Sequence, residues 1–370
     1  MFLAAAALLG ALLLAPARAQ KPEPKPEEKI EPKAEPGYRL TVRADLVNVE
    51  VTVTDARGNF VTGLAHENFR VLDDGAEQPI THFAPAEAPA LVLVLVETSP
   101  AVYLIHRQHL EAAYALLEGL AADDWVALGT YDQSPRLLIN FTQDKSALAQ
   151  ALGSLHYNLG MGQLNLYESL AAALDWLAPL PGKKAIVLLS TGLDTSGAGR
   201  WEKLLEKLRA SDVVVLPVAL GGELRQPGPP GKKDQHDKNK KKKGESVELA
   251  KKGQAVEPAK DDTELSFAQA DRALEGLAQA TGGRAWFPRE AREFPGIYRQ
   301  ISGILRHQYS LGFAPPARDA RFHKIEIQLL DASGRPLAPA EPPKAPGRPP
   351  AEGAAGYRIH ARPGYLAPAQ

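Results

Sequence analysis

The sequence contains no cysteine. This excludes disulfide bonds, thiol nucleophiles, cysteine-bound zinc and a lipid-modified N-terminal cysteine. Charge of one sign is not in excess either: the formal net charge is −1, so no overall field draws the chain toward nucleic acid or an anionic membrane. Beyond residue 15, no apolar run reaches the roughly 20 residues that a membrane-spanning helix needs.

The remaining composition is that of a globular protein. Of the 370 residues, 44% are hydrophobic and 24% are charged, which is enough apolar material for a sizeable core. A chain of this length exceeds one typical domain. We therefore expect one larger domain with one or two smaller ones.

The N-terminus predicts export. Residues 1–19, MFLAAAALLGALLLAPARA, form a short apolar segment that ends in a small-residue cleavage pattern, which is typical of a secretory signal peptide. We expect cleavage after Ala19 and a secreted or periplasmic protein. Residues 20–37 are rich in Pro, Glu and Lys and predict an extended, solvated linker.

Two regions alternate apolar and polar residues with a period of two. Residues 38–84 do so around turns at residues 55–58 and 71–75, which predicts a small antiparallel β domain. Residues 315–370 alternate again in FHKIEIQLL and end in the strand-like YRIHARPGY. We expect a C-terminal β hairpin there.

Residues 88–314 predict an α/β domain. The runs at residues 91–96, 185–190 and 213–218 are apolar throughout, as in parallel strands buried on both faces, and helical stripes lie between them. Residues 308–313, QYSLGF, are expected to complete the strands. The predicted fold class is α/β, with a mostly parallel, Rossmann-like sheet that carries helices on both faces.

Residues 221–264 interrupt this pattern with a lysine-rich stretch that has no apolar periodicity. A basic run can bind polyanions. Here acidic residues are interspersed and aromatic residues are absent. We therefore interpret the stretch as a disordered, solvated insertion and expect no nucleic-acid partner.

Several segments together resemble a bacterial von Willebrand factor A-related protein of the acidobacterial type. They are the β segment of residues 46–83, LVLVLVETS, NLYESLAAAL, AIVLLSTGLDTS, QATGGRAWF, HQYSLGFAP, FHKIEIQL and YRIHARPGY. The resemblance covers residues 38–368 apart from the insertion. It implies binding rather than catalysis, often through a divalent cation at the C-terminal edge of the sheet.

The resemblance also implies the ligands of that cation. They are a D-x-S-x-S motif after the first strand, a threonine on a later loop and an aspartate after the fourth strand. Glu97 keeps a carboxylate at the first position and Ser99 matches the second, whereas Ala101, Leu164 and Thr191 replace the other three ligands.

This substitution pattern argues against a bound metal. Mg²⁺ requires near-octahedral oxygen ligation at about 2.0–2.1 Å. Glu97 is one methylene longer than the aspartate that it replaces, and Leu164 offers no oxygen, so this set of residues would bind the ion weakly. We expect a degenerate metal site and no cofactor, although Mg²⁺ remains a candidate. The alternative is a divalent-cation-dependent adhesion domain that uses Glu97 and Ser99.

The sequence thus predicts a non-enzymatic interaction or adhesion module whose partner is an unidentified protein or envelope polymer. An exported α/β enzyme is a second alternative, although no nucleophile elbow or dinucleotide fingerprint supports it. The expected partner-binding face consists of six residues at the edge of the sheet: Glu97, Thr98, Ser99, Gln163, Thr191 and Asp194.

Overall fold

The computed structural model describes residues 46–103, 106–157, 163–195, 199–222, 260–340 and 356–369. The expected signal peptide, the linker, residues 38–45 of the first β region and most of the insertion lie outside these ranges. Within them, no helix has the length and apolarity that crossing a bilayer requires.

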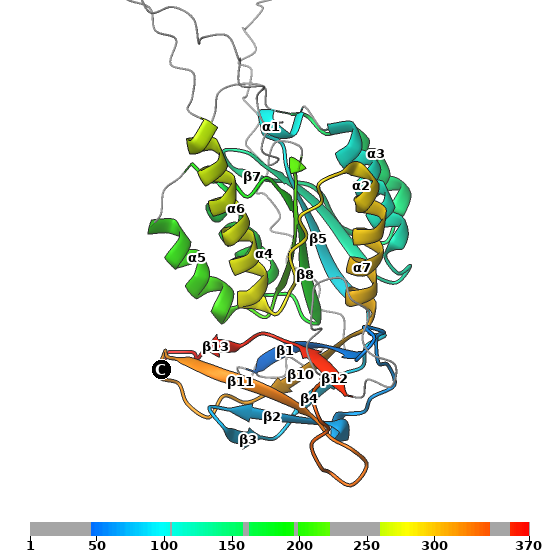
Figure 1. The fold of residues 1–370 in the computed structure, drawn as a ribbon, viewed down its shortest axis with the longest axis vertical. Coiled ribbons are helices and arrows are strands. Elements are labelled where there is room, and N and C mark those ends of the chain that lie inside the picture. Colours follow the sequence, from blue (N-terminus) through cyan, green and yellow to red (C-terminus); the bar gives the residue numbers. More distant parts are fainter. Residues whose placement is uncertain are drawn as a thin grey trace, which may run out of the picture. The chain divides into compact units, whose positions relative to one another are not determined.

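A five-stranded sheet forms the centre of the α/β region (Figure 1). Four consecutive strands pair in parallel, and the fifth pairs antiparallel with its neighbour at one edge. This confirms the predicted mostly parallel sheet. In spatial order the strands are β7 (Pro135–Thr142), β6 (Trp125–Tyr131), β5 (Ala90–Glu97), β8 (Lys183–Ser190) and β9 (Val214–Ala219).

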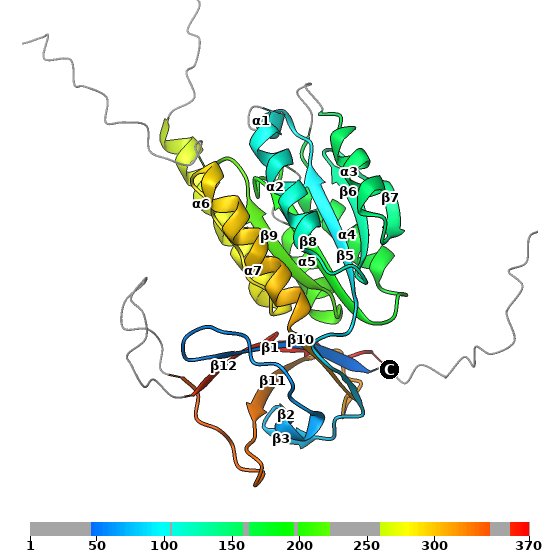
Figure 2. The same cartoon turned by 90° about the vertical axis from the view of Figure 1, so that its right-hand side faces the viewer.

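Helices cover both faces of this sheet (Figures 1 and 2). Successive side chains of a strand point to opposite faces, so Val94 and Val96 of β5 enter one core and Leu93 and Leu95 enter the other. The first core includes side chains of α2 (His106–Gly119), α3 (Lys145–Gly153) and α7 (Phe294–Arg306). The second includes side chains of α4 (Leu166–Leu177), α5 (Gly199–Ala210) and α6 (Lys260–Thr281).

Local sequence explains two of these helices. In α7 the buried residues Ile297, Ile301 and Leu305 recur every four positions and form one apolar stripe. In α3 the side chain of Asp144 accepts hydrogen bonds from the first free backbone N–H groups, as an N-cap does. Helix α6 begins at Lys260, so the last residues assigned to the lysine-rich insertion belong to a helix.

The remaining strands form two four-stranded antiparallel sheets around a separate apolar core. One sheet has the order β12 (Tyr357–His360), β1 (Val47–Asp55), β10 (Gln308–Phe313), β4 (His82–Ala84). The other has the order β13 (Gly364–Leu366), β11 (Phe322–Leu329), β2 (Phe69–Asp73), β3 (Ala76–Gln78).

These two sheets correct three predictions about the β regions. The N-terminal and C-terminal regions are not separate, since β1 and β2 pair with β12 and β11. β11 and β12 do not form the expected hairpin with each other. β10 is not in the central sheet but pairs antiparallel with β1. It is buried along its whole length, and such a strand has the same sequence pattern in either setting.

The α/β region and the two antiparallel sheets belong to one compact unit, residues 44–370. Lys183, at the start of β8, is buried, and its ammonium donates to the backbone carbonyls of Ala86 (2.8 Å) and Gln308 (3.1 Å). Arg362, before β13, is also buried and donates to the carbonyls of Arg209 and Ser211 at the C-terminal end of α5. Buried cations that donate to backbone oxygens therefore connect the two regions.

Candidate functional site

The C-terminal ends of β5 and β8 bring together three residues that the sequence singled out. β5 ends at Glu97, β8 ends at Ser190, and the two strands are parallel neighbours. Carboxyl ends of parallel strands share one edge of a sheet, where ligands bind in open α/β folds. Ser99 and Thr191 accordingly both contact Glu97 at this edge.

The carboxylate of Glu97 is the centre of a hydrogen-bond network. Oε1 accepts from the hydroxyl of Ser99 at 2.5 Å. Oε2 accepts from the backbone N–H of Thr191 at 2.7 Å. The Thr191 hydroxyl lies 3.0 Å from Oε1 and 2.9 Å from Oε2. Residues at two of the family's ligand positions thus donate to a residue at a third.

Two further members of this network were not identified from the sequence. The Tyr131 hydroxyl lies 3.1 Å from Oε2 of Glu97 and 2.6 Å from the Ser190 hydroxyl. Ser190 in turn lies 3.2 Å from the same Oε2 and accepts the Gly192 N–H at 2.8 Å. No local pattern in the sequence marked Tyr131, which lies beside Glu97 because the two residues are paired where β5 and β6 end.

The network is closed to solvent. Glu97 and Thr191 are both 0% exposed. Burial raises the pKa of Glu97, and the hydrogen bonds from Ser99, Thr191 and Tyr131 counteract only part of that rise. Burial also raises the pKa of Tyr131, and the neighbouring negative charge of Glu97 raises it further. The carboxyl group is therefore held by the chain's own donors.

The other two family ligand positions offer no oxygen to this network. The side chain of Leu164 is buried in the core under α4 and α5. Its backbone N–H and C=O are both bonded to Thr195. Ala101 lies in the short helix α1 (Pro100–Tyr103), and an alanine side chain carries no ligand atom.

Four of the six residues of the expected partner-binding face are buried in this structure. Glu97, Thr98, Ser99 and Thr191 hydrogen-bond to one another or to the end of β6. Gln163 is exposed. Asp194 is partly exposed, and its carboxylate accepts the Tyr167 N–H at 2.9 Å near the start of α4.

A pocket of about 390 Å³ lies at the same edge of the sheet, beside the end of β6. Its Asp132 and Arg136 form an ion pair at 3.0 Å. Burial alone would raise the pKa of Asp132, but the hydrogen bond and charge of Arg136 lower it. The Ser154 hydroxyl donates to the carbonyl of Ala151 at 2.9 Å, as a helix-end residue does. The lining residues are Thr130, Asp132, Arg136, Leu138, Ser154, His156 and Tyr157.

Comparison with known proteins finds several similar solved structures. No family model matches the chain, and no curated protein matches it. A von Willebrand factor type A structure from Catenulispora acidiphila is 10% identical over 79% of this chain and 72% of that chain, with a TM-score of 0.42. An aerotolerance-related membrane protein from Bacteroides fragilis is 14% identical over 58% of this chain and 98% of that chain, with a TM-score of 0.39.

A third similar structure is the von Willebrand domain of the type V pili tip protein Mfa5 from Porphyromonas gingivalis. It is 25% identical over 29% of this chain and 39% of that chain, with a TM-score of 0.25. The α/β region of the present chain has the mostly parallel, helix-covered sheet that the sequence resemblance implied.

Proposed function

We propose that the chain is an exported, non-enzymatic interaction module of the von Willebrand factor A type in which the metal position is closed. The observation that carries this proposal is the Glu97 carboxylate, fully buried and bonded to Ser99, Thr191 and the Tyr131–Ser190 pair. The predicted signal peptide supports export. The strand order and the helices on both faces support the scaffold.

The closed network competes directly with a cation. A divalent ion would need the carboxylate oxygens of Glu97 as ligands, but both oxygens already accept hydrogen bonds from Ser99 and Thr191. An ion would have to break these bonds in a buried site and draw its missing ligands from water. Leu164 fills the threonine position with an alkyl group. The alternative, cation-dependent adhesion through Glu97 and Ser99, requires this rearrangement.

The surface available to a partner lies outside the buried network. β7 is the edge strand of the central sheet, and its Leu137 and Leu138 are 48% and 43% exposed. Leu138 also lines the pocket beside Arg136. An edge strand with exposed apolar side chains is a typical place for another chain to dock. A protein or envelope polymer is the class of partner that we propose.

Catalysis is the less favoured alternative for a chemical reason. A hydrolase of the α/β type needs a hydroxyl held by an imidazole base. In the pocket, the Ser154 hydroxyl is bonded to a backbone carbonyl, and Asp132 is paired with Arg136. These bonds describe an ordered surface pocket rather than an activated nucleophile.

Calorimetric titration of the mature chain with Mg²⁺, Mn²⁺ and Ca²⁺ tests the proposal. The wild-type chain and the Glu97→Ala variant are compared under the same conditions. We expect the Glu97→Ala substitution to leave any heat of metal binding unchanged. Saturable binding of one ion per chain that is lost in Glu97→Ala would overturn the proposal and establish cation-dependent adhesion.

A further inference from the structure

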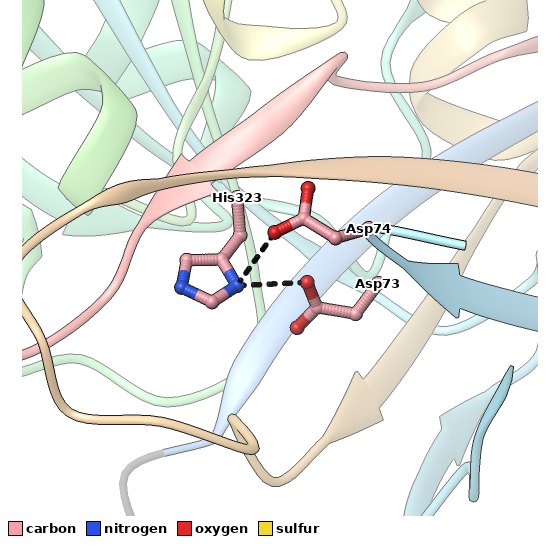
Figure 3. Close-up of side chains that lie close together, drawn as sticks. All are labelled: Asp73, Asp74 and His323. Carbon is pink, nitrogen blue, oxygen red and sulfur yellow. Dashed lines mark hydrogen bonds and ion pairs between the residues drawn. The ribbon is translucent and has the colours of Figure 1, made fainter. Parts of the chain in front are cut away.

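A second cluster of ligand-type side chains lies in the antiparallel sheets, apart from the Glu97 network (Figure 3). It consists of Asp73 at the end of β2, Asp74 in the turn that follows, and His323 in β11. We propose that these three residues bind one divalent transition-metal ion of the zinc type, which fastens the N-terminal strand β2 to the C-terminal strand β11.

The three donor atoms converge. Nδ1 of His323 lies 2.9 Å from Oδ1 of Asp73 and 3.3 Å from Oδ2 of Asp74, and all three atoms lie within 4.8 Å of one another. Tetrahedral zinc has bonds of about 2.0–2.2 Å to nitrogen and oxygen, which places neighbouring ligand atoms roughly 3.3 Å apart. The distance from His323 to Asp74 therefore already fits such an ion, and the distance from His323 to Asp73 needs to open by only a few tenths of an ångström.

Each proposed ligand is also oriented from outside the cluster. Nε2 of His323 lies 3.2 Å from Oδ1 of Asp319, and Oδ2 of Asp73 accepts the Tyr365 hydroxyl at 2.7 Å. Oδ1 of Asp74 accepts the Lys324 N–H at 2.9 Å. A carboxylate on the far nitrogen of a histidine, with further bonds to the carboxylate ligands, is the usual surrounding of a protein-bound zinc ion.

Charge supports a divalent occupant. Three carboxylates surround one imidazole, and Asp73 and His323 are buried, where charges are normally paired or bound to a metal. A proton on the imidazole supplies one positive charge, whereas a divalent ion supplies two.

The site is open on one side. The side chain of Asp74 is 57% exposed, so an ion can enter from solvent and keep a water molecule as its fourth ligand. β2 and β11 pair along Asp73 to Phe69 and Ile325 to Leu329, and the ion would close the end of that pairing. The inference shares no residue with the Glu97 network and does not depend on the proposed function.

Titration of the full mature chain with Zn²⁺, followed by calorimetry and by thermal unfolding, tests the inference. We expect one ion per chain and a higher unfolding temperature with Zn²⁺. Asp74→Asn is the key variant because its exposed side chain can change without disturbing the core, and it should abolish the binding. Asp319→Asn should weaken binding by about 10–100-fold because it removes only the orienting carboxylate.

His66→Gln is the matched control, since His66 is exposed and pairs with the carboxylate of Glu67 at 3.0 Å without a third ligand. It should bind Zn²⁺ as the wild type does. The absence of Zn²⁺ binding would overturn the inference, and so would equal affinity in wild type and Asp74→Asn. Nitrogen NMR of the imidazole gives an independent readout. A His323 ring that carries protons on both nitrogens in excess Zn²⁺ would show that the cluster holds a proton instead.

Discussion

Thr191 donates both its backbone N–H and its hydroxyl to the carboxylate of Glu97 across the edge of the central sheet. The family resemblance implies metal ligands at both positions, which would donate oxygen lone pairs to a cation. In this chain one of the two residues donates hydrogen bonds to the other. Both side chains are buried.

Removing the Thr191 hydroxyl should destabilise the protein. Thr191→Val keeps the shape of the side chain but leaves the buried Glu97 carboxyl with one donor fewer. We expect a loss of about 1–3 kcal/mol in the free energy of unfolding, measured with urea. Thr195→Val is the control, because the exposed Thr195 hydroxyl bonds only to the backbone of Leu164 in the bonds described. A loss in Thr191→Val no larger than in this control would contradict the account.

Glu50 should make stability fall as the pH rises. Glu50 is buried in β1, and its Oε2 has no hydrogen-bond partner among the described residues. Burial raises its pKa from 4.5 to about 8, although the hydrogen bond from Ser310 and the positive charge of Lys183 lower it in part. Between these two pKa values the folded chain holds a proton that the unfolded chain has released. Stability is therefore fully present below pH 4.5 and is lost as the pH rises toward 8.

The measurement is urea unfolding across that pH range, for wild type and Glu50→Gln. Glutamine stays neutral, so the free energy of unfolding of Glu50→Gln should fall less steeply with pH than that of the wild type. The two slopes should differ by up to about 1.4 kcal/mol per pH unit. Glu97 also has a raised pKa and stays in both proteins, so the difference between them isolates Glu50. Parallel curves for the two proteins would contradict the prediction.

Arg362 should not tolerate lysine. Its buried guanidinium donates to the carbonyls of Gly364, Ser211 and Arg209, and burial lowers its pKa to about 10. A lysine ammonium cannot reach three carbonyls in the fork geometry of arginine. We expect Arg362→Lys to lose about 1–3 kcal/mol in thermal or urea unfolding, because buried carbonyls are left without donors.

Arg335→Lys provides the comparison for that variant. Arg335 pairs with Asp331 on the surface, with 79% of its side chain exposed. Its replacement should change stability by less than about 0.5 kcal/mol. If both variants behave alike, the buried contacts of Arg362 do not hold the C-terminal strands to the α/β region.

Gly282 should be more sensitive to alanine than Gly334. Both have positive φ, +74° and +78°, where a Cβ costs about 1–2 kcal/mol. At Gly282, after the end of α6, the added Cβ would also overlap the backbone of Ala361 and Arg362, whereas at Gly334 it meets open space. We expect Gly282→Ala to cost clearly more in unfolding free energy. Equal costs would mean that the chain around Arg362 moves aside freely.

The sequence predicted the central sheet well because its signals are local. The mainly apolar runs at residues 91–96 and 185–190 favour a strand that is buried on both faces. Each of them forms a parallel strand of the central sheet. The turn at Asp74 and Gly75 was likewise predicted from its own residues. Here the pattern within one segment was sufficient.

The antiparallel sheets could not be predicted in the same way. Val71 pairs with Ile327, which lies more than two hundred residues further along the chain. No pattern in either segment identifies the other as its pairing partner. Asp73 and His323 are separated by a similar number of residues, so their cluster was not identified from the sequence. The burial of Glu97 could not be predicted either, because Tyr131 and Ser190 enclose it and their positions depend on strand register.

The measurement that tests the central claim most directly is the effect of Mn²⁺ on the backbone amide NMR signals of Ser99, Thr191 and Gly192. These amides lie at the Glu97 carboxylate, so a paramagnetic ion bound there would broaden them strongly. The account predicts that stoichiometric Mn²⁺ leaves their line widths unchanged, whether or not signals near Asp73 and His323 broaden. Broadening of the three signals that disappears in Glu97→Ala would show that the edge of the sheet still binds a cation, and would contradict the account.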